Sequence, residues 1–254
     1  MTTDFVKMEG LGNDFIVVAA DVEPTKDDVI AWCDRRFGIG ADGVLRVVPL
    51  GPDRVQMIYW NADGLEAEMC GNGLRCIATL AVDRGWVDGP EMVVETAAGP
   101  LPAQVQADGL VRALVGRPRI TGDAVMLHGL AFELVDVGNP HAVTFVDDVA
   151  TVDVAGVGSV VETDEMFPNR TNVEFVAVAG TNAIQMRVWE RGVGETMASG
   201  TGSTGAAYAS MTTGRVESPV AVHVPGGVLT IEMVGDEAWM IGPGTTVYEG
   251  TIAT

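Results

Sequence analysis

An internal repeat constrains the fold of this chain more than any other feature of its sequence. Several identical or chemically similar residues recur 129 positions apart, namely Met57 with Met186, Trp60 with Trp189, Glu66 with Glu195, Cys70 with Ser199, Gly71 with Gly200 and Ala78 with Ala207. The pair Gly12-Asn13 matches Gly138-Asn139 at an offset of 126, which is consistent with a loop of different length. So many matches in one register indicate a duplicated unit.

The duplication predicts two domains of similar fold. The 254 residues are enough for two domains of ordinary size, and the turn-rich stretch Gly116–Gly122 separates the copies. We therefore place the domains at residues 1–116 and 117–254. Apolar and alternating segments predict strands, and helical periodicity predicts helices, so each half is mixed and the fold class is α/β (α+β). The expected strands are Asp14–Ala20, Val44–Val48, Arg54–Trp60, Glu91–Thr96, Leu110–Val115, Phe132–Val137, Ala142–Val146, Asn172–Val178 and Ala183–Trp189. The expected helices are Asp27–Phe37 (with Val29, Ile30, Trp32 and Phe37 on its apolar face), Leu74–Val82 and one near Thr204–Met211.

Cys70 and Ser199 each precede a Gly-x-Gly turn that opens an expected helix. Unpaired N–H groups and the helix dipole at such a turn attract an anion, for example a carboxylate. The same field stabilises a thiolate, and because an ordinary cysteine pKa is about 8.5, Cys70 is a plausible base. In a duplicated protein the two turns are expected to meet at the domain boundary, where ligand clefts are common. Cys70 and Ser199 would then approach one small molecule from opposite sides.

The charge and cysteine content exclude several classes of function. A net charge of −20 disfavours nucleic acid and anionic membrane surfaces as partners, because both require clustered Lys and Arg. No apolar run is long enough to span a membrane. Three cysteines cannot all pair, and the N-terminus has no basic segment followed by an apolar one, so a cytoplasmic location is expected.

Two other kinds of site are disfavoured. No Cys-x-x-Cys or His-x-x-His pair is present and the three histidines are scattered, so no metal is expected, and Cys33 and Cys76 fit buried helix positions. The segment Gly200–Ala206 satisfies a dinucleotide-binding pattern. In nucleotide-binding units, however, the glycines directly follow a strand, whereas here residues 191–199 intervene.

Short motifs in the same order along the chain resemble the diaminopimelate epimerase family. They are Gly10–Phe15, Gly38–Gly43, Asn61–Gly64, Met69–Gly73, Gly138–His141, Asn172–Phe175 and Glu190–Gly192. The resemblance implies two pseudo-symmetric α/β domains, each a β-barrel-like sheet around a central helix. It also implies a cytoplasmic, cofactor-independent homodimer that interconverts LL- and meso-diaminopimelate in lysine and cell-wall biosynthesis.

The resemblance also assigns roles to individual residues. Cys70 and Ser199 take the two base positions, and the backbone N–H groups of Gly71-Asn72 and Gly200-Thr201 receive the α-carboxylate. The other substrate-binding residues are Asn13, Asn61, Asn139, Asn172, Glu190 and Arg191, with His141 in a supporting role. These residue types suit an amino-acid substrate, because arginine binds carboxylates bidentately and asparagine offers both a donor and an acceptor. For the asparagines beside Gly or Pro, a role in shaping the turn is the alternative.

Ser199 departs from the family pattern, in which a second cysteine stands at this position. A serine hydroxyl is a much weaker acid and base than a thiol, so symmetric two-base chemistry is not assured. Three interpretations remain open. The first is a diaminopimelate epimerase, either as a natural serine variant or as a catalytically disabled Cys-to-Ser variant. The second is an enzyme of the same fold that uses one base, as an amino-acid isomerase or a hydroxy-amino-acid dehydratase. The third is a ligand-binding or regulatory protein that keeps the cleft but has lost turnover.

Overall fold

The computed structural model describes residues 2–253, which form two compact units. The first unit contains the residues up to Ala113 together with those from Gly242 onward, and the second contains Leu114–Ile241. The first unit comprises β1 (Thr2–Gly10), β2 (Asn13–Val18), α1 (Lys26–Cys33), β3 (Gly43–Gly51), β4 (Arg54–Asn61), β5 (Glu66–Ala67), α2 (Gly71–Asp83), β6 (Glu91–Thr96), β7 (Gly99–Val105) and β19 (Thr245–Ala253). Strand β8 (Val111–Gly116) contains the boundary between the units.

The second unit repeats this order of elements after two short strands of its own. It comprises β9 (Arg119–Ile120), β10 (Val125–Leu127), β11 (Leu130–Asp136), β12 (Pro140–Phe145), a 3-10 turn (Val149–Thr151), α3 (Val154–Glu162), β13 (Asn172–Gly180), β14 (Ala183–Glu190), β15 (Gly194–Thr196), α4 (Gly200–Thr212), β16 (Val220–Val224), β17 (Gly227–Val234) and β18 (Glu237–Gly242). Strand β13 begins 129 residues after β3, and α4 begins 129 residues after α2.

The parallel strand pairs are the same in the two units. Strand β2 pairs in parallel with β3, as β12 does with β13, and β4 pairs in parallel with β6, as β14 does with β16. The register also agrees, because Phe15 lies opposite Gly43 as His141 lies opposite Asn172. Both units therefore contain the repeat that the sequence predicts, in a mixed α+β fold.

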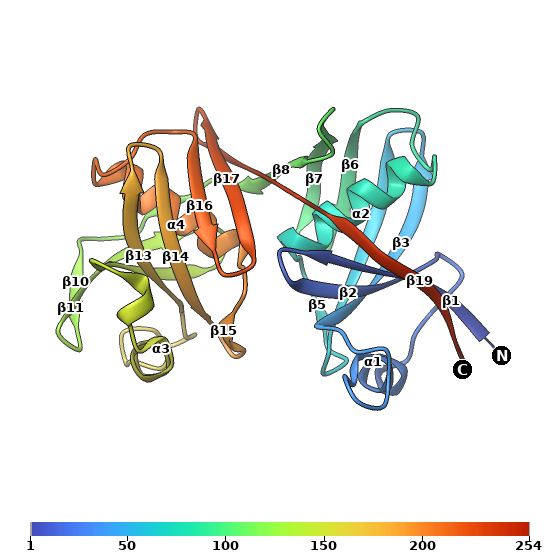
Figure 1. Cartoon of the computed structure of the whole chain (residues 1–254), viewed down its shortest axis with the longest axis horizontal. Coiled ribbons are helices and arrows are strands. Elements are labelled where there is room, and N and C mark those ends of the chain that lie inside the picture. Colours follow the sequence, from blue (N-terminus) through green and yellow to red (C-terminus); the bar gives the residue numbers. More distant parts are fainter. Residues whose placement is uncertain (1, 254) are drawn as a thin grey trace. The chain divides into compact units, whose positions relative to one another are not determined.

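A central helix in each unit is enclosed by strands (Figure 1). Helix α2 contacts strands β1, β2, β3, β4, β6, β7 and β19, and α4 contacts β11, β12, β13, β14, β16 and β17. Small residues allow this close packing, since Ala78 and Ala81 of α2 and Ala206 and Ala207 of α4 are completely buried. Large apolar residues such as Phe15 and Leu45 complete the core of the first unit. Each helix N-terminus is thereby held in place within its own unit.

Two parts of the fold differ from the sequence-based expectation. The C-terminal strand β19 pairs with β1 and therefore belongs to the first unit, whereas the duplication predicts residues 242–254 in the second domain. The first helix ends at Cys33 and not at Phe37, because the Asp34 carboxylate accepts the backbone N–H groups of Arg36 and Phe37 and closes a turn. As a result Phe37, expected on an apolar helix face, is 93% exposed.

We expect acid to destabilise the fold partly through Asp14. Burial alone would raise its pKa, but hydrogen bonds from Arg35 and Lys7 lower the pKa of Asp14 to about 2. Because an aspartate in an unfolded chain has a pKa of about 3.9, the ionised carboxylate stabilises the fold at neutral pH and this contribution is lost as the pH falls toward 2. About 1 kcal/mol should already be lost at pH 3. Urea unfolding at pH 7 and pH 3 should therefore show a smaller pH effect in Asp14→Asn; equal effects in both proteins would contradict this.

Within residues 2–253, no helix is long and apolar enough to cross a membrane.

Candidate active site

Cys70 is the N-cap residue of α2. Its backbone is extended, with φ −139° and ψ 115°, and the N–H of Gly73 donates to Sγ across 3.5 Å. The backbone carbonyl of Cys70 accepts the N–H of Leu74 at 2.8 Å, which begins the helix. The half-buried thiol therefore lies at the positive end of the helix dipole, where negative charge on sulfur is stabilised.

Asn13 connects Cys70 to a network of charged residues. Its Oδ1 lies 3.6 Å from Cys70 Sγ and accepts from Asn72 Nδ2 at 3.1 Å. Its Nδ2 donates to Asp42 Oδ2 at 2.7 Å, and Asp42 in turn accepts from Arg35. Because a carboxylate only accepts hydrogen bonds, Asp42 fixes the Asn13 amide with its oxygen toward Cys70.

Ser199 is the N-cap residue of α4, equivalent to Cys70. Its φ of −130° and ψ of 122° reproduce those of Cys70, and the N–H of Gly202 donates to its Oγ at 3.2 Å. Ser199 is only 3% exposed, whereas Cys70 is partly exposed. The repeat thus places a thiol and a hydroxyl in the same local geometry, each in its own unit.

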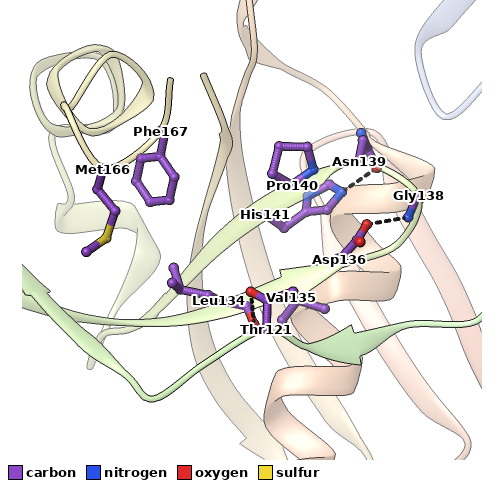
Figure 2. A pocket seen from close by; sticks show the side chains of 10 residues that line it. All are labelled: Thr121, Leu134, Val135, Asp136, Gly138, Asn139, Pro140, His141, Met166 and Phe167. Atoms are coloured by element: carbon purple, nitrogen blue, oxygen red, sulfur yellow. Dashed lines mark hydrogen bonds between the residues drawn. The ribbon is translucent and has the colours of Figure 1, made fainter. Parts of the chain in front are cut away.

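A chain of hydrogen bonds leads from the interior of the second unit to the start of α4. Glu174 Oε1 lies 2.6 Å from His141 Nδ1, and His141 Nε2 lies 2.9 Å from Asn139 Oδ1. Asn139 Nδ2 then donates to Thr201 Oγ1 at 3.4 Å. Figure 2 shows the imidazole of His141 directed at Asn139. The structure therefore brings Asn139, His141 and Thr201 together, close to Ser199.

A cavity of about 390 Å³ adjoins this chain of hydrogen bonds in the second unit (Figure 2). It is lined by Thr121, Leu134, Val135, Asp136, Gly138, Asn139, Pro140, His141, Met166 and Phe167. Asn139 and His141 thus separate the cavity from the N-terminus of α4. Asn139, which is expected to bind substrate, is partly exposed, whereas His141, which is expected to support binding, is buried.

Asn172, Glu190 and Arg191 form a second group in the same unit. Asn172 is buried; its Oδ1 accepts the backbone N–H of Arg191 and its Nδ2 donates to the carbonyl of Pro140, both at 2.9 Å. Glu190 accepts from the Thr196 hydroxyl at 2.6 Å. Asn172 therefore shapes the turn that carries Arg191.

Glu162, at the end of α3, holds the same turn. Its carboxylate accepts from the Trp189 indole at 2.7 Å and from the N–H of Gly192 at 2.8 Å.

Asn61, in the first unit, is exposed at the end of β4, where its Oδ1 accepts from the Tyr59 hydroxyl at 2.7 Å.

Comparison with known proteins identifies the family. The sequence model of the family described as Diaminopimelate epimerase matches residues 5–121 and 133–251. The chain belongs to the diaminopimelate epimerase family. The diaminopimelate epimerase of Moorella thermoacetica is 42% identical over 272 residues, covering 97% of this chain and 98% of that protein. The diaminopimelate epimerase of Neisseria meningitidis is 40% identical over 279 residues, covering 99% of each. The family resemblance is thereby confirmed, and the chain is an isomerase.

A solved structure supports the fold assignment. A phenazine biosynthesis protein of the PhzF family from Bacillus anthracis matches with a TM-score of 0.76, covering all of both chains at 18% identity. At this identity the likeness concerns the fold alone. It confirms the predicted fold class for this member of the diaminopimelate epimerase family.

Three residues of the site were not singled out by sequence reasoning, namely Asp42, Glu162 and Glu174. Asp42 and Glu174 lie within segments quoted as family motifs, Gly38–Gly43 and Asn172–Phe175, so the signal was present without a role attached to it. Glu162 lies in a helix that the sequence analysis did not predict. Asp42 and Glu174 contact the predicted site residues Asn13 and His141, and Glu162 holds the turn that follows Arg191.

The three thiols of this epimerase-family chain should differ sharply in reactivity. Burial raises the pKa of Cys33 to about 11 and that of Cys76 to about 12, whereas Cys70 is partly exposed at a helix N-terminus. Because the thiolate is the reactive form, a disulfide reagent at pH 8 should modify one thiol rapidly in the folded protein and three in denaturant. The rapid phase should be missing from Cys70→Ala. Rapid modification of a second thiol in the native protein would refute this ordering.

Proposed function

We propose that this chain interconverts LL- and meso-diaminopimelate within lysine and peptidoglycan biosynthesis. In this proposal Cys70 transfers the α-proton as a base, and Ser199 occupies the opposite base position. The observation that carries it is the repeat itself, which gives Cys70 and Ser199 the same N-cap geometry at the start of α2 and α4. Family membership supplies the substrate class.

The chemistry of the α-proton supports these roles. This proton is a weak acid, so its removal needs preorganised positive charge near the carboxylate. Backbone N–H groups at the start of each helix supply such charge, those of Gly71-Asn72 in α2 and of Gly200-Thr201 in α4. We assign Arg191 and Glu190 to substrate charges, and Asn13, Asn61, Asn139 and Asn172 to substrate binding or to orienting the residues that bind it.

The two base positions are unequal in this proposal. A thiol with a pKa near 8.5 ionises to a useful extent at neutral pH, whereas a serine hydroxyl does not. Ser199 Oγ accepts the N–H of Gly202, so its own proton remains for donation. We infer that proton transfer on the Ser199 face is the slow step of inversion.

Ser199 also favours a second candidate function. An enzyme with one effective base exchanges or eliminates on a single face of its substrate, as an amino-acid isomerase or a hydroxy-amino-acid dehydratase does. For such a reaction Cys70 alone would suffice and Ser199 would only cap α4. The family match favours the epimerase. The serine at position 199 favours the one-base enzyme.

Chiral chromatography distinguishes the two candidates. The wild-type protein is incubated with LL-diaminopimelate and, separately, with meso-diaminopimelate and with a panel of hydroxy amino acids. The epimerase proposal predicts that each diaminopimelate isomer forms the other and that no keto acid is released. Keto-acid release without any inversion would establish the one-base alternative. Binding of diaminopimelate with neither reaction would identify a protein that has lost turnover.

A further inference from the structure

A buried carboxylate lies beneath the N-terminus of α4. Glu174, on β13, has no exposed side-chain surface, and its Oε1 lies 2.6 Å from Nδ1 of the equally buried His141. The same oxygen lies 3.0 Å from the point where a Cβ on Gly202 would be. Burying an ionised carboxylate costs stability unless its charge is compensated, so a buried Glu174 suggests a role other than packing.

The first unit fills the equivalent space with apolar side chains. By the register of the parallel pairs, Phe15 is the counterpart of His141 and Leu45, two residues beyond Gly43, is the counterpart of Glu174. The methyl groups of Leu45 lie 3.1 Å from a Cβ position on Gly73, much as Glu174 Oε1 lies 3.0 Å from a Cβ position on Gly202. Because Phe15 and Leu45 complete the same fold without charge, the His–Glu pair is not needed for packing.

The surroundings favour a pair that is neutral overall. Burial raises the pKa of Glu174, although His141 opposes this effect, and the other charged groups that act on the pair are the acidic Glu190 on β14 and Asp136 on β11. A neutral pair holds two protons, as a carboxylate with an imidazolium or as a carboxylic acid with a neutral imidazole. Glu174 Oε2 is buried and has no hydrogen-bond partner among the described residues, so the shared proton lies between Oε1 and Nδ1, and in both forms Nε2 of His141 carries a hydrogen.

The proton on Nε2 determines how the Asn139 amide is turned. Nε2–H donates to Asn139 Oδ1 at 2.9 Å, so the amide NH₂ group points away from His141 and toward Thr201 in the first turn of α4. In the first unit Asp42 turns the equivalent Asn13 the other way, with its oxygen toward Cys70. The two equivalent asparagines thus present opposite ends of their amides.

We propose that Glu174, acting through His141, is a positioning residue that keeps the Asn139 NH₂ group directed at a carboxylate held at the N-terminus of α4. This rests on the proposed function, because it takes the ligand to be an α-amino acid. Without the Nε2 proton, the amide would reverse to donate to His141. Its oxygen would then face the carboxylate and repel it.

The first arm of the test needs no substrate. ¹⁵N spectra of the histidine side chains in the free wild-type protein report which imidazole nitrogens carry hydrogen, and His141→Phe assigns the His141 signals among those of His128 and His223. We expect a protonated Nε2 at pH 7.5. A neutral imidazole with hydrogen only on Nδ1 would overturn the proposal, whether or not the protein is an epimerase.

The second arm measures α-hydrogen exchange of diaminopimelate. The double variant His141→Phe/Glu174→Leu copies the Phe15–Leu45 pair and should fold, yet its kcat/KM should fall on the order of tenfold to a hundredfold, mainly through KM. Glu174→Gln should retain most activity, because an amide NH₂ can donate to Nδ1 and leave hydrogen on Nε2. A folded double variant with wild-type KM and kcat would overturn the proposal. A wild type that exchanges nothing would refute the proposed function, and the nitrogen spectra would still decide the role of Glu174.

Discussion

Ser199→Cys is expected to accelerate the inversion of diaminopimelate by about a hundredfold or more, because a well-placed general acid or base contributes factors of this size. The pKa of an ordinary thiol, about 8.5, lies much closer to the working pH than that of a hydroxyl, and the N-terminus of α4 would stabilise the thiolate against the effect of burial. The backbone needs no adjustment, since Ser199 has φ −130° and ψ 122° where Cys70 has −139° and 115°. Chiral chromatography of the products formed from each diaminopimelate isomer measures the gain.

Ser199→Ala is the matched control for this change. It removes the hydroxyl and leaves the start of α4 without its side-chain cap to Gly202. If Ser199 donates the proton, inversion should slow further in this variant. A folded Ser199→Cys protein that inverts no faster than the wild type would mean that position 199 takes no part in proton transfer, and the one-base alternative would then be preferred.

Cys70→Ala should abolish α-hydrogen exchange, with a loss of at least about a thousandfold. No other described thiol can replace it, because Cys33 and Cys76 are buried and burial raises both of their pKa values. Exchange is followed by NMR as the α-proton signal of diaminopimelate disappears in D₂O.

Cys33→Ala serves as the control for loss of a thiol elsewhere in the same unit. Cys33 packs with Val29 and Trp32 of α1, so its replacement should cost some stability and little activity. Retention of substantial exchange by Cys70→Ala would disprove the assignment of Cys70 as the base.

The repeat made much of the fold predictable. Strands β3 and β13 begin 129 residues apart, as do helices α2 and α4, so the position of β13 can be predicted from that of β3, and the position of α4 from that of α2. Local patterns were less informative where side chains decide the outcome. Helix α1 ends where it does because the Asp34 carboxylate accepts two backbone N–H groups. The periodicity of apolar residues carries no information about such a side-chain interaction. Strand β19 joins the first unit through pairing with β1 at the far end of the sequence, which no local pattern predicts.

The candidate site was predictable as residue types and not as a network. Cys70 and Ser199 were evident from their glycine-rich turns, and the structure gives both the N-cap geometry expected of them. The bonds of Asn13 to Asp42 and of His141 to Glu174 join residues 29 and 33 positions apart, and neither has a counterpart in the other unit. A buried Glu in a strand also runs against the usual preference of charged residues for the surface. Sequence periodicity therefore gave no indication that Glu174 orients other residues.

The unequal base pair is tested most directly by exchange rates measured for each isomer separately in D₂O. Wild-type protein is given LL-diaminopimelate or meso-diaminopimelate, and deuterium at the α-carbons is compared with the amount of inverted product at early times. If Cys70 is the strong base and Ser199 the weak one, one isomer should exchange its α-hydrogen much faster than it is inverted, and the other should exchange no faster than it is inverted. Equal exchange of both isomers at the rate of inversion would contradict this account, as would no exchange of either.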